Sequence, residues 1–154
     1  PVSDQPPMTS QSVPMGRQKP WVRIGPDSTE IVADTLFELV GPDWFDDLAG
    51  RFYDGVAEDP VLRPLYPDDL AGPAGRLAGF LCQYWGGPAD YSVERGHPRL
   101  RMRHAPYVIG SVQRDAWLAC MSTAVAGGGL TRSAESAVME YFLNAAQHLV
   151  NAPD

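Results

Sequence analysis

Residues 94–106 read ERGHPRLRMRHAP, and they place four of the chain's 12 cations within the nine residues from Arg95 to Arg103. So dense a cluster favours an anion site, although a solvated basic loop fits equally well in a chain whose cations are almost all arginine. His104 follows these arginines and stands two residues before a proline that restricts the local backbone. Both a structural histidine and a ligand histidine fit this position.

The remaining composition is that of an acidic globular chain. Its 154 residues carry a net charge of −7 and are 44% hydrophobic, which is enough apolar material for one core and too little length for two ordinary domains. The net charge argues against a general nucleic-acid or anionic-membrane surface. No stretch approaches the roughly 18 to 20 apolar residues that span a bilayer. Cys82 and Cys120 form no CxxC pair, which favours reduced thiols and a cytoplasmic protein.

Apolar residues recur at helical spacing in four long segments, which end near residues 59, 85, 126 and 151. Thr35 and Glu38 form the capping box of a shorter helix before them. No alternation typical of strands has comparable length. We therefore expect an all-α fold with four substantial helices and several short ones. Residues 1–28 are rich in proline and have no apolar period, so we expect a disordered N-terminal extension. The alternative for its Trp21 to Ile24 patch is docking on the domain or on a partner.

Common catalytic signatures such as GxSxG, a P-loop or HExxH are absent from the sequence. A metal site built on His97 and His104 is disfavoured, because Pro98 interrupts a continuous helix between them. An iron porphyrin needs one axial imidazole, an apolar slot and cations near its two propionates. His104, the helical apolar residues and the arginines supply all three. The candidate slot residues, each of which also fits an ordinary core, are Phe80, Leu81, Trp117, Met121 and Phe142.

Several motifs, in order and spacing, resemble those of group II truncated haemoglobins. They are Arg51-Phe52-Tyr53, Ala57 to Leu62, Leu65-Tyr66-Pro67, QYWGGP at 83–88, Gly96 to Pro106 and Arg114 to Leu118. The resemblance covers about residues 35–151. It implies a two-over-two helical sandwich around one haem b, with the proximal helix mostly replaced by loop. The domain organisation is then the extension at 1–28 and a truncated globin domain at 29–154.

The resemblance also implies roles for the matched residues. His104 corresponds to the proximal histidine that binds the iron. The distal residues whose hydroxyl or indole N–H groups stabilise a bound ligand are Tyr53, Tyr66 and Trp117. The residues expected to contact the cofactor are Leu77, Phe80, Arg99, Arg103, Met121 and Phe142. One residue fewer than usual separates Tyr66 from Leu77, so either Pro73 or Ala74 occupies the distal gate.

The function expected on this basis is reversible binding of O2 and other diatomic ligands at a five-coordinate-capable iron, with slow ligand release. NO, CO and peroxide are further candidate ligands. The alternatives are a redox enzyme of the nitric-oxide dioxygenase or peroxidase type, which would need an external reductase, and a haem-based sensor module. A homodimer is compatible with the resemblance, and no nucleic acid or membrane span is expected.

Overall fold

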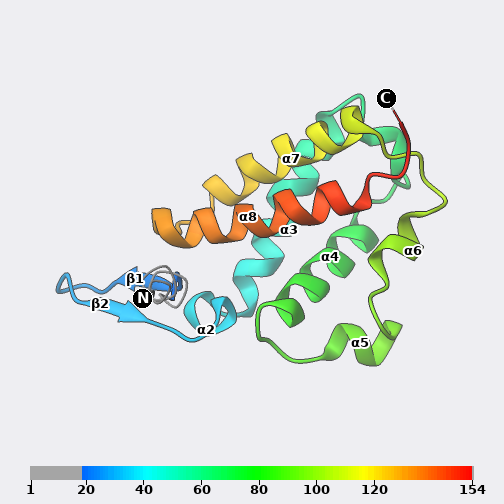
Figure 1. The fold of residues 1–154 in the computed structure, drawn as a ribbon. Helices are drawn as coiled ribbons and strands as arrows, with labels where there is room; N and C mark the ends of the chain where they lie inside the picture. The colour runs from blue at the N-terminus through cyan, green and yellow to red at the C-terminus, as the bar shows by residue number, and fades with distance from the viewer. Residues whose placement is uncertain (1–18, 154) are drawn as a thin grey trace, which may run out of the picture.

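The computed structural model describes residues 19–153. Four long helices form most of it, as the all-α prediction requires (Figure 1). In chain order the elements are β1 (Val22–Ile24), β2 (Glu30–Val32), α2 (Leu36–Val40), α3 (Pro42–Glu58), the 3-10 turn η3 (Arg63–Leu65), α4 (Ala71–Tyr84), α5 (Asp90–Arg95), α6 (Leu100–His104), α7 (Ser111–Ala126) and α8 (Arg132–Leu149).

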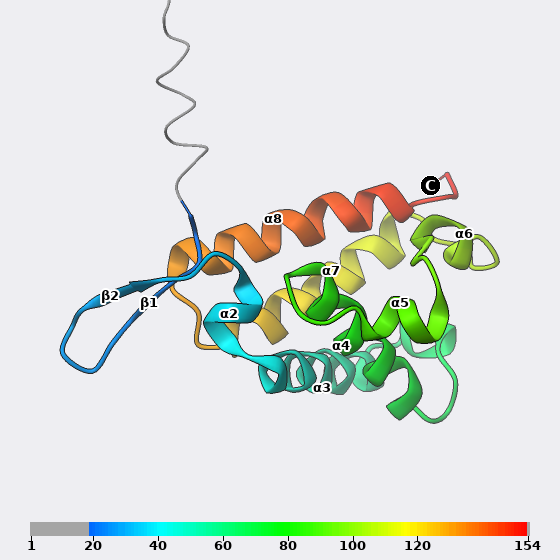
Figure 2. The same ribbon diagram turned by 90° about the horizontal axis from the view of Figure 1, so that it is seen from below.

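The long helices pack as two pairs, with α3 against α4 and α7 against α8, and α3 also contacts α7 (Figures 1 and 2). The sequence explains the interior of this arrangement. Phe45, Leu48, Phe52 and Val56 lie on one face of α3, and each is at most 1% exposed. Burial of each such side chain contributes about 1.5–3 kcal/mol. The apolar period of the sequence therefore identified the face of α3 that forms the core.

The two glycines that follow α4 allow a close approach between chain segments. Gly86 has φ +104°, and a Cβ added there would lie 2.7 Å from the Cβ of Thr35. Thr35 caps α2 by accepting a hydrogen bond from the backbone N–H of Glu38 (3.0 Å). The backbone N–H of Phe37 donates to the carbonyl of Trp85 at 3.0 Å. The turn after α4 is thus fixed against the start of α2, which sets where the chain leaves α4.

The N-terminal part of the described chain differs from the expected disorder. β1 and β2 pair antiparallel, with Val22 opposite Val32, and form a hairpin that projects from the helices (Figures 1 and 2). Trp21 meets Trp85 edge to face, with ring centroids 6.5 Å apart. Strands of three residues are too short to give a readable period. The contact with Trp85 agrees with the alternative in which the Trp21 to Ile24 patch docks on the domain. The rest of the predicted extension, residues 1–18, lies outside the described residues.

The segment between Gly86 and His104, where the resemblance implies that loop replaces most of the proximal helix, contains two short helices, α5 and α6. α6 spans five residues, and its N-cap, Arg99, has φ +44° in the left-handed region. The proximal region is thus a single helical turn entered through a sharp bend. Within residues 19–153, none of the helices is both long and apolar enough to cross a membrane.

Candidate functional site

A cavity of about 520 Å³ lies among α3, α4, α5, α6, α7 and α8. Its volume is in the range of ligand and cofactor sites. Most of its wall is apolar and comes from these six helices and from η3 with its flanking residues. The lining residues include Phe52, Tyr53, Leu62, Leu65, Tyr66, Pro73, Arg76, Leu77, Phe80, Tyr91, Arg95, Leu100, Arg103, His104, Tyr107, Arg114, Trp117, Tyr141 and Phe142.

His104, at the end of α6, is the one histidine in this wall. Its Nδ1 lies 2.6 Å from the carbonyl oxygen of Leu100, one turn earlier. Since a carbonyl can only accept a hydrogen bond, Nδ1 carries the proton and Nε2 keeps its lone pair. A backbone partner on the other ring nitrogen is the usual way in which proteins orient a metal-binding histidine. His97, by contrast, is exposed, and its Nδ1 accepts from the backbone N–H of Arg99 (3.2 Å).

Three polar aromatic residues form a connected group elsewhere in the wall. The rings of Tyr53 and Tyr66 meet edge to face with centroids 5.4 Å apart. The hydroxyl of Tyr66 is hydrogen bonded to the side chains of both Tyr53 and Trp117. An indole N–H can only donate, so Trp117 donates to the Tyr66 oxygen.

The pKa shifts of the two tyrosines indicate which hydroxyl donates in the hydrogen bond between Tyr53 and Tyr66. Burial raises the pKa of Tyr66, and the hydrogen bonds from Tyr53 and Trp117 oppose that rise. Burial also raises the pKa of Tyr53, and the hydrogen bond to Tyr66 raises it further, as expected for the donor of that bond. The signs of these shifts are those of a Tyr66 oxygen that accepts from both neighbours, an arrangement that leaves its own O–H to a ligand in the cavity.

Arginines supply the positive charge of the site. Arg76, Arg95, Arg103 and Arg114 contribute to the lining. Arg114 donates to Asp115 (3.0 Å) and to Gln147 (2.6 Å). One nitrogen of Arg103 donates to the backbone carbonyl of Arg95 at 2.7 Å. Arg103 was predicted as a cofactor contact. Arg95 was predicted only as a member of the basic cluster, and Arg76 was not predicted at all, because no local pattern reports that α4 turns its side chain toward the cavity.

Most residues singled out from the sequence meet in this cavity. Tyr53, Tyr66, Leu77, Phe80, Leu81, Arg103, His104, Trp117 and Phe142 all line it. Two do not. Met121 is fully buried in the core, and Arg99 is exposed at the start of α6. Of the two candidates for the distal gate, Pro73 is in the lining and Ala74 packs against the core.

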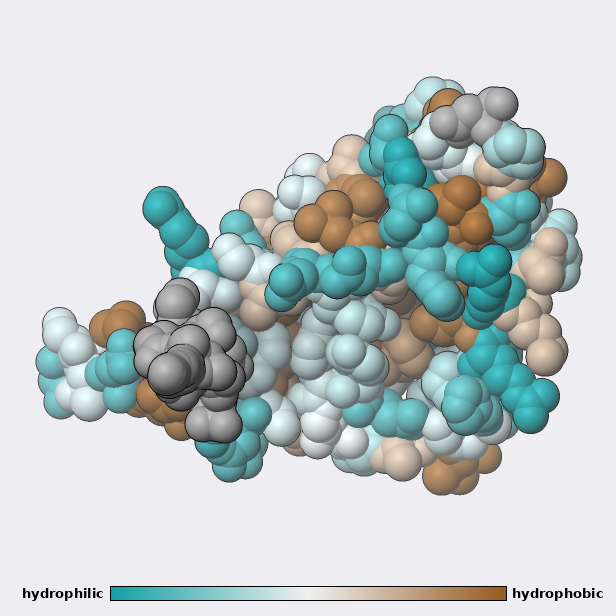
Figure 3. Space-filling model, in the orientation of Figure 1, coloured by the Kyte–Doolittle hydropathy of each residue, from teal (hydrophilic) through white to brown (hydrophobic). Residues whose placement is uncertain are grey.

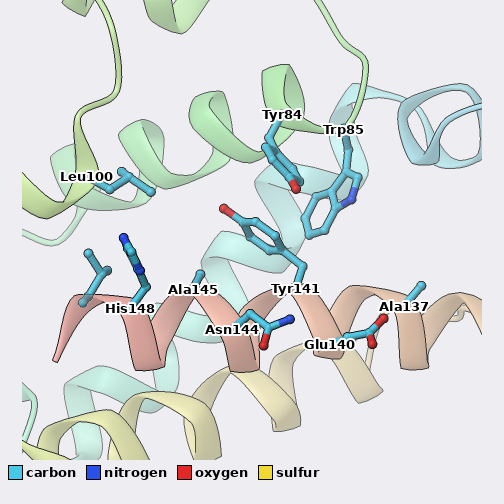
Figure 4. Close-up of a pocket in the computed structure, with 10 residues that line it drawn as sticks. Tyr84, Trp85, Leu100, Ala137, Glu140, Tyr141, Asn144, Ala145 and His148 are labelled. Atoms are coloured by element: carbon cyan, nitrogen blue, oxygen red, sulfur yellow. The ribbon is translucent and has the colours of Figure 1, made fainter.

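A second, more open groove of about 570 Å³ lies between the end of α4 and α8 (Figure 4). It shares Leu100, Tyr141, Ala145 and Leu149 with the first cavity. The rings of Tyr84 and Tyr141 lie 4.3 Å apart at 33°, and these two tyrosines face each other in Figure 4. Burial raises the pKa of Tyr141 to about 12. Because Tyr141 is common to both linings, it forms part of the wall between the groove and the cavity.

The residues of the first cavity fit a haem. It offers one imidazole with a free Nε2, an apolar wall and arginines at its edge, which match the axial ligand, macrocycle and propionates of that cofactor. The arginines would hold the carboxylates by charge-assisted hydrogen bonds. His104 is the side chain of this set that could bind the iron.

Comparison with known proteins agrees with this interpretation. Residues 35–151 match the family model of bacterial-like globins. The chain is 40% identical over 119 residues to a group 2 truncated haemoglobin of Bacillus subtilis, covering 75% of this chain and 87% of that protein.

Solved structures give the same result. A thermostable haemoglobin of Thermobifida fusca is 52% identical with a TM-score of 0.76, over 78% of this chain and 99% of the other. The truncated oxygen-avid haemoglobin of B. subtilis is 38% identical with a TM-score of 0.73, over 77% and 100%. The chain therefore belongs to the bacterial-like globins as a group II truncated haemoglobin, a protein that binds haem b and, through it, O2 and related diatomic ligands.

Proposed function

We propose that His104 is the axial ligand and that Tyr53, Tyr66 and Trp117 stabilise the bound diatomic ligand, so that this protein releases O2 slowly. The observation that carries the proposal is that one cavity contains both a histidine with a free Nε2 and a hydrogen-bonded group of three polar aromatics. The haem iron supplies the bond to the diatomic ligand. The oxygen-avid character of the similar B. subtilis haemoglobin supports the same expectation for this chain.

The residues of this chain would divide the work as follows. His104 holds the cofactor and is itself oriented by Leu100. Tyr66 presents its O–H to the partial negative charge of bound O2 and is oriented by Tyr53. The N–H of Trp117, which donates to the Tyr66 oxygen in this structure, would turn to the bound ligand. Buried phenols with raised pKa values remain protonated donors at neutral pH. Slow release suits storage, sensing or redox chemistry better than rapid delivery.

Leu77, Phe80 and Phe142 would pack against the macrocycle, because all three line the cavity. We assign the propionates to Arg103 together with Arg76 or Arg95, and not to Arg99, which is exposed and outside the lining.

Three further proposals concern the compartment, the reductant and the assembly of the protein. The free thiols Cys82 and Cys120 favour the reducing cytoplasm. A haem that oxidises during turnover needs an external reductase, whether the role is O2 binding or nitric-oxide dioxygenase chemistry. Association into a homodimer stays a prediction of the resemblance.

Replacement of the proposed axial ligand tests the proposal. We expect His104→Ala to lose tight haem retention, or to give an abnormal ferrous spectrum that added imidazole restores. His97→Ala and His148→Ala serve as matched controls and should resemble wild type, because neither residue lines the cavity. An unchanged ferrous deoxy spectrum in His104→Ala would exclude this assignment.

A further inference from the structure

The segment that covers the proximal side of the cavity is strongly basic, although the protein is acidic. Residues 93–112 contain four arginines and a single carboxylate, Glu94, while the whole chain has a net charge of −7. The other carboxylates of the chain are therefore placed elsewhere in the sequence. The positive charge of this segment is opposite in sign to the net charge of the whole chain, so it needs its own explanation.

Internal ion pairs do not account for it. Within residues 19–153 the ion pairs are Lys19 with Asp34 and Arg114 with Asp115. Arg101 and Arg103 donate to backbone carbonyls, which carry no net charge to neutralise them. Arg99 is exposed at the left-handed start of α6. Even if two arginines of the cavity hold the propionates, Arg99 and Arg101 remain exposed cations without a carboxylate partner in the described structure.

Apolar side chains are exposed in the same region. Nine large hydrophobic residues of the described chain are exposed, and five of them fall between residues 93 and 112. They are Val93, Met102, Tyr107, Val108 and Val112, of which Val93 is 82% exposed and Met102 64%. On the side where α5 and α6 lie, Figure 3 shows hydrophilic and hydrophobic residues intermingled. Exposed apolar residues among unpaired charges are typical of a protein interaction surface.

The inner side of this segment forms part of the cavity. Leu100, Arg103, His104 and Tyr107 all line it. A partner seated on the outer side would therefore be separated from the cofactor by a single short layer of chain. This short separation matters most for a partner that exchanges electrons with the cofactor, because electron transfer needs the two groups to lie close together.

We propose that the surface formed by residues 93–112, here named the proximal face, docks a small acidic electron-carrier protein that reduces the haem iron. The carrier loses one electron and the ferric iron gains it, with no bond made or broken. This inference rests on the proposed function, because it needs haem in the cavity beside His104. Electron-transfer encounters bury less than about 1,200 Å², which suits a local patch of this kind.

An acidic protein fits this surface better than an anionic membrane does. α5 and α6 have six and five residues, too few to present a long amphipathic face to lipid. An extended anionic surface would also meet the net negative charge of the remaining molecule. A small carrier meets only the charges within about one Debye length, roughly 8 Å at physiological salt.

The test measures reduction of the ferric holoprotein by reduced flavodoxin, a small acidic FMN protein, under anaerobic stopped-flow conditions. The variant Arg99→Glu/Arg101→Glu reverses two exposed charges of the proximal face. The control Arg23→Glu/Arg132→Glu makes the same charge change at exposed positions outside it. We expect the first variant to lower the second-order rate constant about tenfold or more at low ionic strength, and the difference to vanish in high salt. The control should change it less than twofold.

Two further measurements separate the causes. Absorption spectra and reduction by dithionite report on the haem site, so a variant with normal spectra and slow flavodoxin reduction supports the docking surface. An abnormal spectrum would show damage to α6, and Arg99→Gln, which leaves the Arg101 contact to the His148 carbonyl intact, then replaces the double variant. Equal slowing in the proximal and control variants would overturn the proposal. The proposal would also be overturned if wild type bound phosphatidylserine vesicles and the proximal variant did not, while flavodoxin reduced both proteins at the same rate.

Discussion

Trp117→Phe should speed O2 dissociation more than any other single change among the three distal aromatics. Tyr66 accepts hydrogen bonds from both Tyr53 and Trp117. Removal of the Tyr66 hydroxyl therefore frees two donors, and either can turn toward the bound ligand. Removal of the indole N–H frees none, because Tyr66 already has its own hydrogen available. The phenyl ring of the variant keeps the contacts that Trp117 makes with Phe52, whose ring centroid is 5.1 Å away.

The size of the effect follows from the kind of bond that is lost. A hydrogen bond to a group with partial negative charge in a buried site contributes about 1.5–3 kcal/mol. At about 1.4 kcal/mol per factor of ten, its loss speeds dissociation roughly tenfold to a hundredfold, if the stabilisation belongs to the bound state. Tyr53→Phe removes only a group that orients Tyr66 and should change the rate by a few fold.

Stopped-flow displacement of O2 by CO measures these rates. In the double variant Tyr66→Phe/Trp117→Phe the increase should exceed the product of the two single effects, because Trp117 is then no longer present to compensate for the lost Tyr66 hydroxyl. Dissociation of CO, which carries little negative charge, is the internal control and should change much less. Equal O2 dissociation rates in Trp117→Phe and wild type would make Trp117 a packing residue. Simple multiplication of the single effects would refute the shared network.

Three further changes test the scaffold that positions the site. Gly86→Ala should lower the free energy of unfolding, measured in urea, by about 1–3 kcal/mol, because φ is +104° and the new Cβ would approach the Thr35 side chain to 2.7 Å. The control is Gly79→Ala in α4, where nothing lies within 4 Å of an added Cβ, and it should raise the free energy of unfolding by about 0.5–1 kcal/mol. Asn151→Asp keeps the oxygen that accepts from Ile109 but loses the N–H group that donates to the carbonyls of His104 and Tyr107. Transfer of haem from this variant to excess apomyoglobin should therefore be about threefold to tenfold faster than from wild type. The free energy of unfolding should fall as the pH rises from 10 to about 12, because the pKa of Tyr141 is about 12 in the folded protein and 10 in the unfolded chain. This fall should be smaller in Tyr141→Phe, which has no hydroxyl to titrate.

The long helices were predictable because each must bury one apolar face. The end predicted near residue 126 coincides with the end of α7, and Thr35 caps α2 as its sequence position indicated. These features depend on local spacing and on single side chains that bond to the nearby backbone. Such signals are readable in one chain without any knowledge of what packs against it.

The composition of the cavity wall was only partly predictable. Met121 has the same helical spacing as Trp117, yet one is buried in the core and the other lines the cavity. The distinction depends on the rotation of α7 about its own axis, which the packing of its neighbours determines. Arg76 and Arg99 show the same limit, because the orientation of α4 and the left-handed turn before α6 decide which of them reaches the site.

The short proximal helix connects these observations. An isolated helix of five residues is unstable in water, so α6 exists only because other parts of the chain hold it. On one side Arg101 donates to the carbonyl of His148, and beyond the helix Asn151 bonds to the carbonyls of Tyr107 and His104. A ligand that binds the native state alone stabilises it, so haem bound at His104 would add a further anchor from the cavity side. The proximal face should therefore be better ordered in the holoprotein than in the apoprotein, and an electron carrier that docks there would recognise the form that contains a haem to reduce.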